Sequence, residues 1–123
     1  MTEDMVILSR TFDFVSWLLP RTLDFPRGQR FAVTKRLQDA ALDFYERIAE
    51  ANVGRGASRQ ESLCAADAAL DKVRFYLRLC VNWGWLSPGQ HRHVSGMIAE
   101  MGRLLGGWRK ATASERGGAL GTG

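Results

Sequence analysis

The stretch from residue 63 to residue 83, LCAADAALDKVRFYLRLCVNW, decides the fold of this chain. Apolar residues recur in it at alternating spacings of three and four, which places them on one narrow stripe of a helix. The members of this stripe are Leu63, Ala66, Leu70, Val73, Leu77 and Cys80. Ala69, Tyr76 and Trp83 form a second stripe beside the first. A helix with two adjoining apolar stripes needs partners on more than one side, so we expect a central helix of a bundle.

Two further helices are expected before this one. Residues 3–19 carry one apolar stripe through Ile7 and Phe14 and a second through Phe12, and Pro20 should end the helix because proline cannot continue it. Pro26 suits the first turn of the next helix, which the apolar pattern carries to about Val53.

Start signals mark the last two helices. Ser58 with Glu61 three residues later has the spacing of a capping box, so the central helix should begin at Ser58 and end at Gly84. Ser87-Pro88-Gly89-Gln90 repeats the start signal for a final helix. Four glycines weaken that helix and would be tolerated where another backbone comes close. They are Gly96, Gly102, Gly106 and Gly107.

The short connections between four helices predict an all-α protein, an antiparallel up-down-up-down four-helix bundle. We expect the bundle to span residues 1–111. Residues 112–123 are rich in Gly, Ser and Thr and are expected to form a flexible C-terminal tail.

Composition limits the protein class. A chain of 123 residues is one domain, and an apolar fraction of 46% argues against global disorder. No apolar run approaches the ~20 residues that span a bilayer, so no membrane partner is expected. The chain begins Met1-Thr2-Glu3-Asp4, acidic where a secretory signal would be basic, and we expect a cytoplasmic protein. Cys64 and Cys80 lie about 24 Å apart on one helix and cannot pair, so both are expected to be small buried residues.

The chain is basic and its cations are mostly arginine. The formal net charge is +4, and all of the 17 basic residues except Lys35, Lys72 and Lys110 are Arg. Arginine suits phosphate and carboxylate partners, although a GC-rich genome would also favour it.

Antiparallel topology brings four helix ends to one pole of the bundle, where cations should gather. These are Arg21, Arg27, Arg30, Lys35, Arg36, Arg78, His91, Arg92 and His93. The alternative is that these charges lie scattered on different sides of the bundle. The candidate residues for binding a nucleic acid or a protein partner are Arg21, Arg27, Arg30, Lys35, Arg36, Arg74, Arg78 and Arg92. An acidic stripe, Asp39, Asp43, Glu46 and Glu50, is either a solvated face or a docking edge for a basic partner.

Catalytic chemistry is not evident in the sequence. It contains no P-loop, no dinucleotide-binding loop and no CxxC pair. His91 and His93 are two residues apart, so they do not face the same side of a helix, and we expect no metal site. We therefore expect neither a cofactor nor an enzyme. Trp83-Gly84-Trp85 either plugs the end of the bundle core or stacks on nucleobases.

The order and spacing of several segments resemble the Avd family, the accessory variability determinants of diversity-generating retroelements. The segments cover about residues 5–110. They are Thr11-Phe12-Asp13 through Trp17-Leu18-Leu19-Pro20, Phe25-Pro26-Arg27 with Arg30-Phe31, Leu70-Asp71-Lys72-Val73-Arg74 with Arg78-Leu79, and Gly102-Arg103-Leu104-Leu105-Gly106-Gly107-Trp108. The four-helix protein encoded in intervening sequences of large-subunit ribosomal RNA genes is a wider relative.

The resemblance implies more than the composition does. Avd proteins are four-helix bundles that assemble into a basic homopentamer, bind the retroelement's reverse transcriptase and its template RNA or DNA, and support mutagenic retrohoming without a catalytic site. By this resemblance we expect a non-enzymatic reverse transcriptase accessory protein. The alternative is a structural or protein-interaction bundle of the intervening-sequence type, without a nucleic-acid function.

Overall fold

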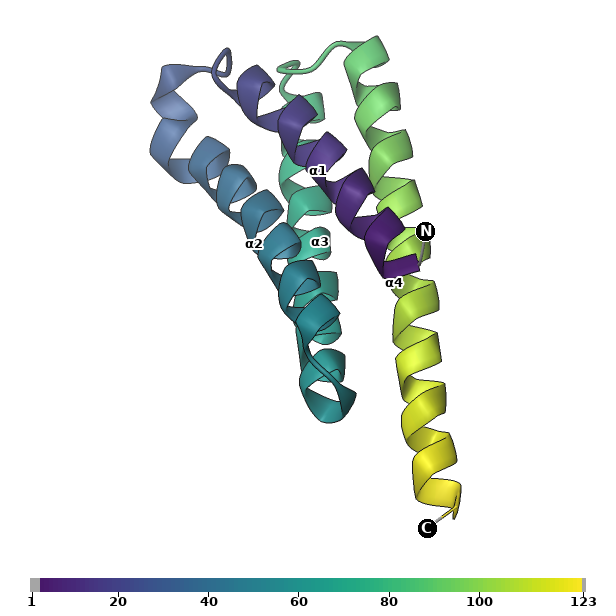
Figure 1. Ribbon diagram of the computed structural model, residues 1–123. Coiled ribbons are helices and arrows are strands. Elements are labelled where there is room, and N and C mark those ends of the chain that lie inside the picture. The colour runs from purple at the N-terminus through teal and green to yellow at the C-terminus, as the bar shows by residue number, and fades with distance from the viewer. Residues whose placement is uncertain (1–2, 123) are drawn as a thin grey trace.

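The computed structural model describes the backbone of residues 3–122 and the side chains of residues 5–115. All of its described elements are helical: α1 (Glu3–Thr22), the 3₁₀ turn η1 (Arg27–Gln29), the π turn η2 (Arg30–Thr34), α2 (Lys35–Val53), α3 (Gly56–Asn82) and α4 (Pro88–Thr122). Figure 1 shows the chain running up and down through four long helices, as expected for a four-helix bundle.

The core confirms the apolar stripe from which the fold was inferred. All six residues of the main stripe on α3 are buried, and Leu63, Leu70 and Val73 are completely so. The second stripe is only partly confirmed, because Ala69 is buried whereas Trp83 is 44% exposed. The main stripe meets core residues from the other helices, including Phe14, Phe44 and Met101.

The bundle has a ring-like order. Helix α2 packs against α1 and α3, and α4 packs against α3 and α1. The side formed by α1 and α2 therefore lies opposite the side formed by α3 and α4. The candidate binding residues lie on both sides.

Pro20 does not end α1, contrary to the prediction. It lies inside the helix, which continues to Thr22. The last turn unwinds into i→i+3 hydrogen bonds, from Leu23, Asp24 and Phe25 N–H groups to the carbonyls of residues 20–22, and the Thr22 hydroxyl donates to the Leu19 carbonyl at 2.6 Å. A proline near a helix end forfeits only one backbone bond, and these bonds satisfy the terminal carbonyls.

The second helix does not begin as a regular α-helix at Pro26. Pro26 precedes η1, a single 3₁₀ turn, and η2 follows as a π turn before regular α-helix starts at Lys35. The backbone N–H of Lys35 donates to the carbonyl of Arg30, the i→i+5 bond of a π-helix. The apolar spacing did not indicate this departure.

The two expected capping boxes have different outcomes. Ser87 and Gln90 form theirs: Gln90 N–H donates to Ser87 Oγ at 3.1 Å, and Ser87 N–H donates to Gln90 Oε1 at 2.9 Å. Ser58 does not cap α3, which begins earlier, at Gly56, after a turn in which Gly56 has φ +57°. The helix thus starts before the residue that was expected to cap it.

The end of α3 is as expected. Gly84 has φ +74°, Trp85 N–H donates to the Cys80 carbonyl at 2.9 Å, and Gly84 N–H donates to the Val81 carbonyl at 3.0 Å. This pair of bonds is a Schellman motif, in which glycine adopts the left-handed conformation without a steric cost.

Helix α4 extends beyond the other three helices at its C-terminal end (Figure 1). It remains helical to Thr122, past residue 111 where the sequence pattern placed the end of the bundle, and the Thr112 side chain is buried with its hydroxyl donating to the Trp108 carbonyl at 2.9 Å. Residue 123 of the expected tail lies outside the described residues, and the flexibility of this segment stays a prediction.

The four glycines singled out in α4 meet no other backbone among the described residues. A Cβ at Gly96, Gly106 or Gly107 would have nothing within 4 Å. At Gly102, a Cβ would lie 2.7 Å from Nη2 of Arg74, so the glycine leaves room for an arginine side chain.

No helix among the described residues combines the length and the apolar character needed to cross a membrane.

Candidate functional site

The four helix ends expected to share a pole do so in the structure. The end of α1, the η1 and η2 turns, the end of α3 and the start of α4 lie together at the top of Figure 1. The basic side chains at this pole, however, divide between the α1–α2 side and the α3–α4 side rather than forming one compact cluster.

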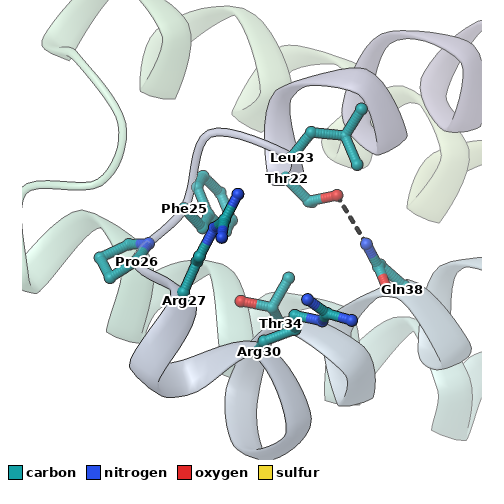
Figure 2. Close-up of a pocket in the computed structure, with 8 residues that line it drawn as sticks. All are labelled: Thr22, Leu23, Phe25, Pro26, Arg27, Arg30, Thr34 and Gln38. Carbon is teal, nitrogen blue, oxygen red and sulfur yellow. Dashed lines mark hydrogen bonds between the residues drawn. The ribbon is translucent and has the colours of Figure 1, made fainter.

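On the α1–α2 side, Arg27 and Arg30 lie in a hollow of about 440 Å³, which we call the Arg27–Arg30 pocket. It is lined by Thr22, Leu23, Phe25, Pro26, Arg27, Arg30, Thr34 and Gln38 (Figure 2). Gln38 Nε2 donates to Thr22 Oγ1 at 2.8 Å and so ties α2 to the end of α1. Neither arginine forms an ion pair with a carboxylate among side chains 5–115.

On the opposite side, α3 and α4 enclose a groove of about 480 Å³, the α3–α4 groove. The exposed side chains of Arg74, Arg78 and His91 line it over buried Leu77 and Val94. Arg74 also pairs with Asp71, with 2.7 Å between Nη1 and Oδ1. This exposed pair contributes little to stability, so Arg74 can exchange Asp71 for another anion at small cost.

The guanidinium of Arg21 is engaged by Trp17 of the same helix. Its Nη1 donates to the Trp17 carbonyl at 2.7 Å, and its guanidinium carbon lies 4.2 Å from the centroid of the Trp17 ring. The His93 ring approaches the same tryptophan, with 5.2 Å between ring centroids. Arg21 and His93 thus clamp Trp17 between α1 and α4, which reduces their availability to a partner.

The remaining candidates lie on α2 and at the start of α4. Lys35 Nζ pairs with Asp39 Oδ2 at 2.8 Å, and Arg36 lines a shallow hollow between α2 and α3. Arg92 is exposed on the first turns of α4. The acidic stripe of α2, consisting of Asp39, Asp43, Glu46 and Glu50, is exposed along its whole length. Within it, the Glu50 carboxylate accepts a hydrogen bond from Arg47 and raises the pKa of that arginine.

For the Trp83-Gly84-Trp85 segment, the sequence left open whether it closes the end of the core or stacks on nucleobases, and its two indoles differ in burial. The Trp85 ring lies 5.2 Å from the ring of buried Phe25 and covers the end of the core. Trp83 packs on Trp85 with 5.1 Å between centroids but leaves 44% of its surface exposed. One indole therefore closes the bundle and the other is accessible beside the basic pole.

The two cysteines differ, contrary to the expectation that both are buried. Cys64 is exposed and its sulfur accepts a hydrogen bond from Arg109 Nη2 at 3.7 Å, whereas Cys80 is buried. Burial raises the pKa of the Cys80 thiol to about 11. Among the described residues, His, Cys, Asp and Glu form no group of three or more that could hold a metal ion.

Sequence reasoning missed Thr34. It is 5% exposed, and its Oγ1 has no hydrogen-bond partner among the described residues. A threonine in a helix normally donates to a carbonyl one turn back, as Thr11 does to Ile7 at 2.7 Å. No sequence signal distinguishes the two threonines, because the difference arises from the π turn that Thr34 closes.

A family profile described as bAvd-like matches residues 5–112. The chain belongs to the bAvd-like family. This membership agrees with the resemblance found in the sequence, and it covers all four helices.

The fold of this bAvd-like protein is also found in solved structures. One is a protein of unknown function from the S23 ribosomal protein family of Bacteroides thetaiotaomicron, with a TM-score of 0.80 and 17% identity. The match covers 89% of this chain and 99% of that chain, which shows a common fold. A comparison with curated proteins gives no significant match.

Proposed function

We propose that this bAvd-like protein is a non-enzymatic accessory protein of a diversity-generating retroelement, which binds the reverse transcriptase and the template RNA or DNA in the cytoplasm to support mutagenic retrohoming. The observation that carries the proposal is the family match over residues 5–112. The exposed cations at one pole of the bundle supply a surface of the required charge.

The candidate cations differ in how freely they could contact phosphates. Arg27, Arg30, Arg36, Arg78 and Arg92 are exposed and form no ion pair among side chains 5–115. Lys35 and Arg74 are exposed and their pairs with Asp39 and Asp71 are weak. Arg21 suits the role least, because its guanidinium is already bound to Trp17.

A salt titration with template-like RNA tests the nucleic-acid part. If about five cations meet phosphates, log affinity falls with log salt at a slope of roughly −3.5 for single strands and −4.5 for a duplex. The Arg74→Glu/Arg78→Glu variant removes two cations from the α3–α4 groove and should abolish binding while circular dichroism stays unchanged. Arg55→Glu, at the opposite end of the bundle in the α2–α3 turn, is the matched control.

The proposal fails for nucleic acid if affinity is independent of salt or if the groove variant binds as well as the wild type. For the polymerase, the expected result is co-purification of the reverse transcriptase encoded beside this gene with the wild-type protein. A genomic neighbourhood without a reverse transcriptase gene and a pair of near-identical repeats counts against the retroelement role altogether.

A second candidate function is a protein-interaction bundle without a nucleic-acid role. It is supported by the acidic stripe of α2, next to which Leu42 and Tyr45 are 39% and 38% exposed. An apolar and acidic helix face suits a basic protein partner. Indifference to RNA together with loss of a protein partner in the Asp43→Lys/Glu46→Lys variant would favour this function.

A further inference from the structure

The Arg27–Arg30 pocket differs from the other basic surfaces because it has a buried polar group at its base. Thr34 Oγ1 has less than 1 Å² of exposed surface and no hydrogen-bond partner among the described residues. An unpaired buried hydroxyl costs free energy, so its retention calls for an explanation. In Figure 2 this hydroxyl points toward the side of the pocket on which Arg27 lies.

In Figure 2 the Arg27 guanidinium lies beside the Phe25 ring, and the Arg30 guanidinium lies on the side of Thr34 away from its hydroxyl, so both arginines line the pocket near Thr34. Arg27 belongs to η1 and Arg30 opens η2, the π turn that Thr34 closes. Single π turns occur often at functional sites, because they redirect side chains away from the regular helical positions. Asp24, the carboxylate of the preceding loop, is not among the lining residues, so no fixed anion in the pocket competes for the arginines.

The donors in the pocket suit a phosphate monoester better than a phosphodiester. A monoester carries about −1.5 to −2 charge and three free oxygens, whereas a diester carries one charge and two free oxygens. Two guanidinium groups and one hydroxyl supply two positive charges and three separate donor groups. Arginine also presents paired N–H donors that match phosphate geometry.

The rest of the pocket suits the organic part of a nucleotide. Phe25 and Pro26 form an apolar wall beside Arg27 (Figure 2), and a volume of about 440 Å³ falls within the range of small-molecule sites. Gln38 uses one of its two amide N–H donors on Thr22 Oγ1, so the charged donors of the pocket are Arg27 and Arg30, and Thr34 adds a hydroxyl without a partner among the described residues.

We infer that the Arg27–Arg30 pocket binds the terminal phosphomonoester of a nucleotide, with both arginines on the phosphate oxygens and the Thr34 hydroxyl donating to a third. The nucleotide as ligand class rests on the nucleic-acid role proposed above. Because Thr34 Oγ1 has less than 1 Å² of exposed surface, a phosphate reaches it only after a neighbouring side chain changes rotamer, which takes picoseconds to nanoseconds for exposed side chains.

Three matched ligands test the phosphate chemistry by calorimetric titration of the full chain. We expect adenosine 5′-monophosphate to bind, and both adenosine and cyclic 3′,5′-adenosine monophosphate, a diester, to bind about tenfold or more weakly. Equal affinity for adenosine would overturn the phosphate site, and equal affinity for the cyclic diester would overturn the monoester preference. Inorganic phosphate binding as tightly as the nucleotide would overturn the part played by the apolar wall.

Two isosteric variants test the hydroxyl. Thr34→Val removes the hydroxyl at nearly constant shape and should weaken the binding of the monophosphate about tenfold. Thr34→Ser keeps the hydroxyl and should bind within about twofold of the wild type. Arg30→Gln should weaken binding at least tenfold, whereas Arg55→Gln, at the other end of the bundle, should not. Binding unchanged in Thr34→Val, or lost equally in Thr34→Ser, would contradict the inference.

The result separates this inference from the proposed function. Salt-dependent RNA binding that requires the α3–α4 groove, without monophosphate binding, would remove the pocket site and leave the accessory role standing. Monophosphate binding that depends on Thr34 and Arg30 in a protein that ignores RNA would support the pocket and overturn the proposed nucleic-acid role.

Discussion

The contrast between Cys64 and Cys80 is a difference between two residues on one helix. The fold places Cys80 on the buried stripe of α3 and Cys64 one position after Leu63, on the exposed surface. The spacing alone predicted the burial of Cys80, because it continues the stripe. For Cys64, which lies off the stripe, the same expectation was wrong.

This difference predicts selective alkylation. Iodoacetamide at pH 8 should label Cys64 rapidly and leave Cys80 unmodified, because a thiol with a pKa of about 11 is almost entirely protonated at that pH. Mass spectrometry should find one label per folded chain and two after denaturation. The Cys64→Ser variant should remove the rapid label, and rapid double labelling of the native protein would contradict the assignment.

The raised pKa of the Cys80 thiol also makes the free energy of unfolding depend on pH. Between about pH 9, the ordinary value for cysteine, and pH 11, the unfolded chain loses its Cys80 proton while the folded chain keeps it. This residue therefore contributes stability that is complete below pH 9 and declines as the pH rises toward 11. Cys80→Ala should flatten that part of the pH dependence of the free energy of unfolding.

At the scale of elements, the sequence predicted four helices and the order of their ends, but not every boundary. Gly84 and the Ser87–Gln90 box were right because their signals act locally, through backbone conformation and short hydrogen bonds. The predicted helix end at Pro20 and helix start at Ser58 were wrong. The chain forms i→i+3 hydrogen bonds after Pro20, and α3 already starts at Gly56. The π turn has no composition signal, so neither η2 nor the Arg27–Arg30 pocket could be anticipated.

The two capping serines give a matched prediction. Ser87→Ala should lower the free energy of unfolding by about 1 kcal/mol, because it removes the hydrogen bond that satisfies the Gln90 N–H at the start of α4. Ser58→Ala should change it by much less, since Ser58 does not cap α3. Urea denaturation of both variants measures the difference, and equal effects would refute the observed helix start.

The open glycines of α4 provide a second prediction at this scale. Gly106→Ala and Gly107→Ala should each raise the free energy of unfolding by roughly 0.4–1 kcal/mol, because a Cβ there meets nothing within 4 Å and alanine restricts the unfolded chain. Gly102→Ala should raise the free energy of unfolding by less, since its Cβ would displace the side chain of Arg74. Thermal unfolding at low protein concentration compares the three variants.

For the whole molecule, the four-helix bundle and the pole at which its helix ends meet were predictable, and the distribution of charges around that pole was not. Topology fixes which helix ends meet, so the shared pole of α1, α3 and α4 followed from loop lengths alone. The division of the arginines between the Arg27–Arg30 pocket and the α3–α4 groove depends on the rotation of each helix, which alternating apolar spacings define only coarsely. The internal use of Arg21 depends on a contact with Trp17 that no spacing reveals.

Self-association is the prediction that belongs to the whole molecule. Phe12 is 64% exposed on α1, and by its family resemblance we expect the protein to form a pentamer, about five times the 13.7 kDa chain. Phe12→Ser should shift the mass measured by light scattering toward the monomer, because it removes apolar surface that a subunit contact would bury. A wild-type monomer across concentrations would contradict the expectation, and circular dichroism checks that the variant is folded.

The π turn at residues 30–34 contains one residue more than a regular α-helical turn. Deleting Ala32, which is exposed, should therefore let the backbone close into ordinary α-helical bonding without loss of the packing between α2 and α3. The segment before the deletion would turn by about 100° relative to α2, the angle that one residue occupies in an α-helix. The deletion variant should keep the melting temperature of the wild type but change the position of Arg27 relative to Thr34. Deletion of one residue would then separate the stability of the bundle from binding in the Arg27–Arg30 pocket.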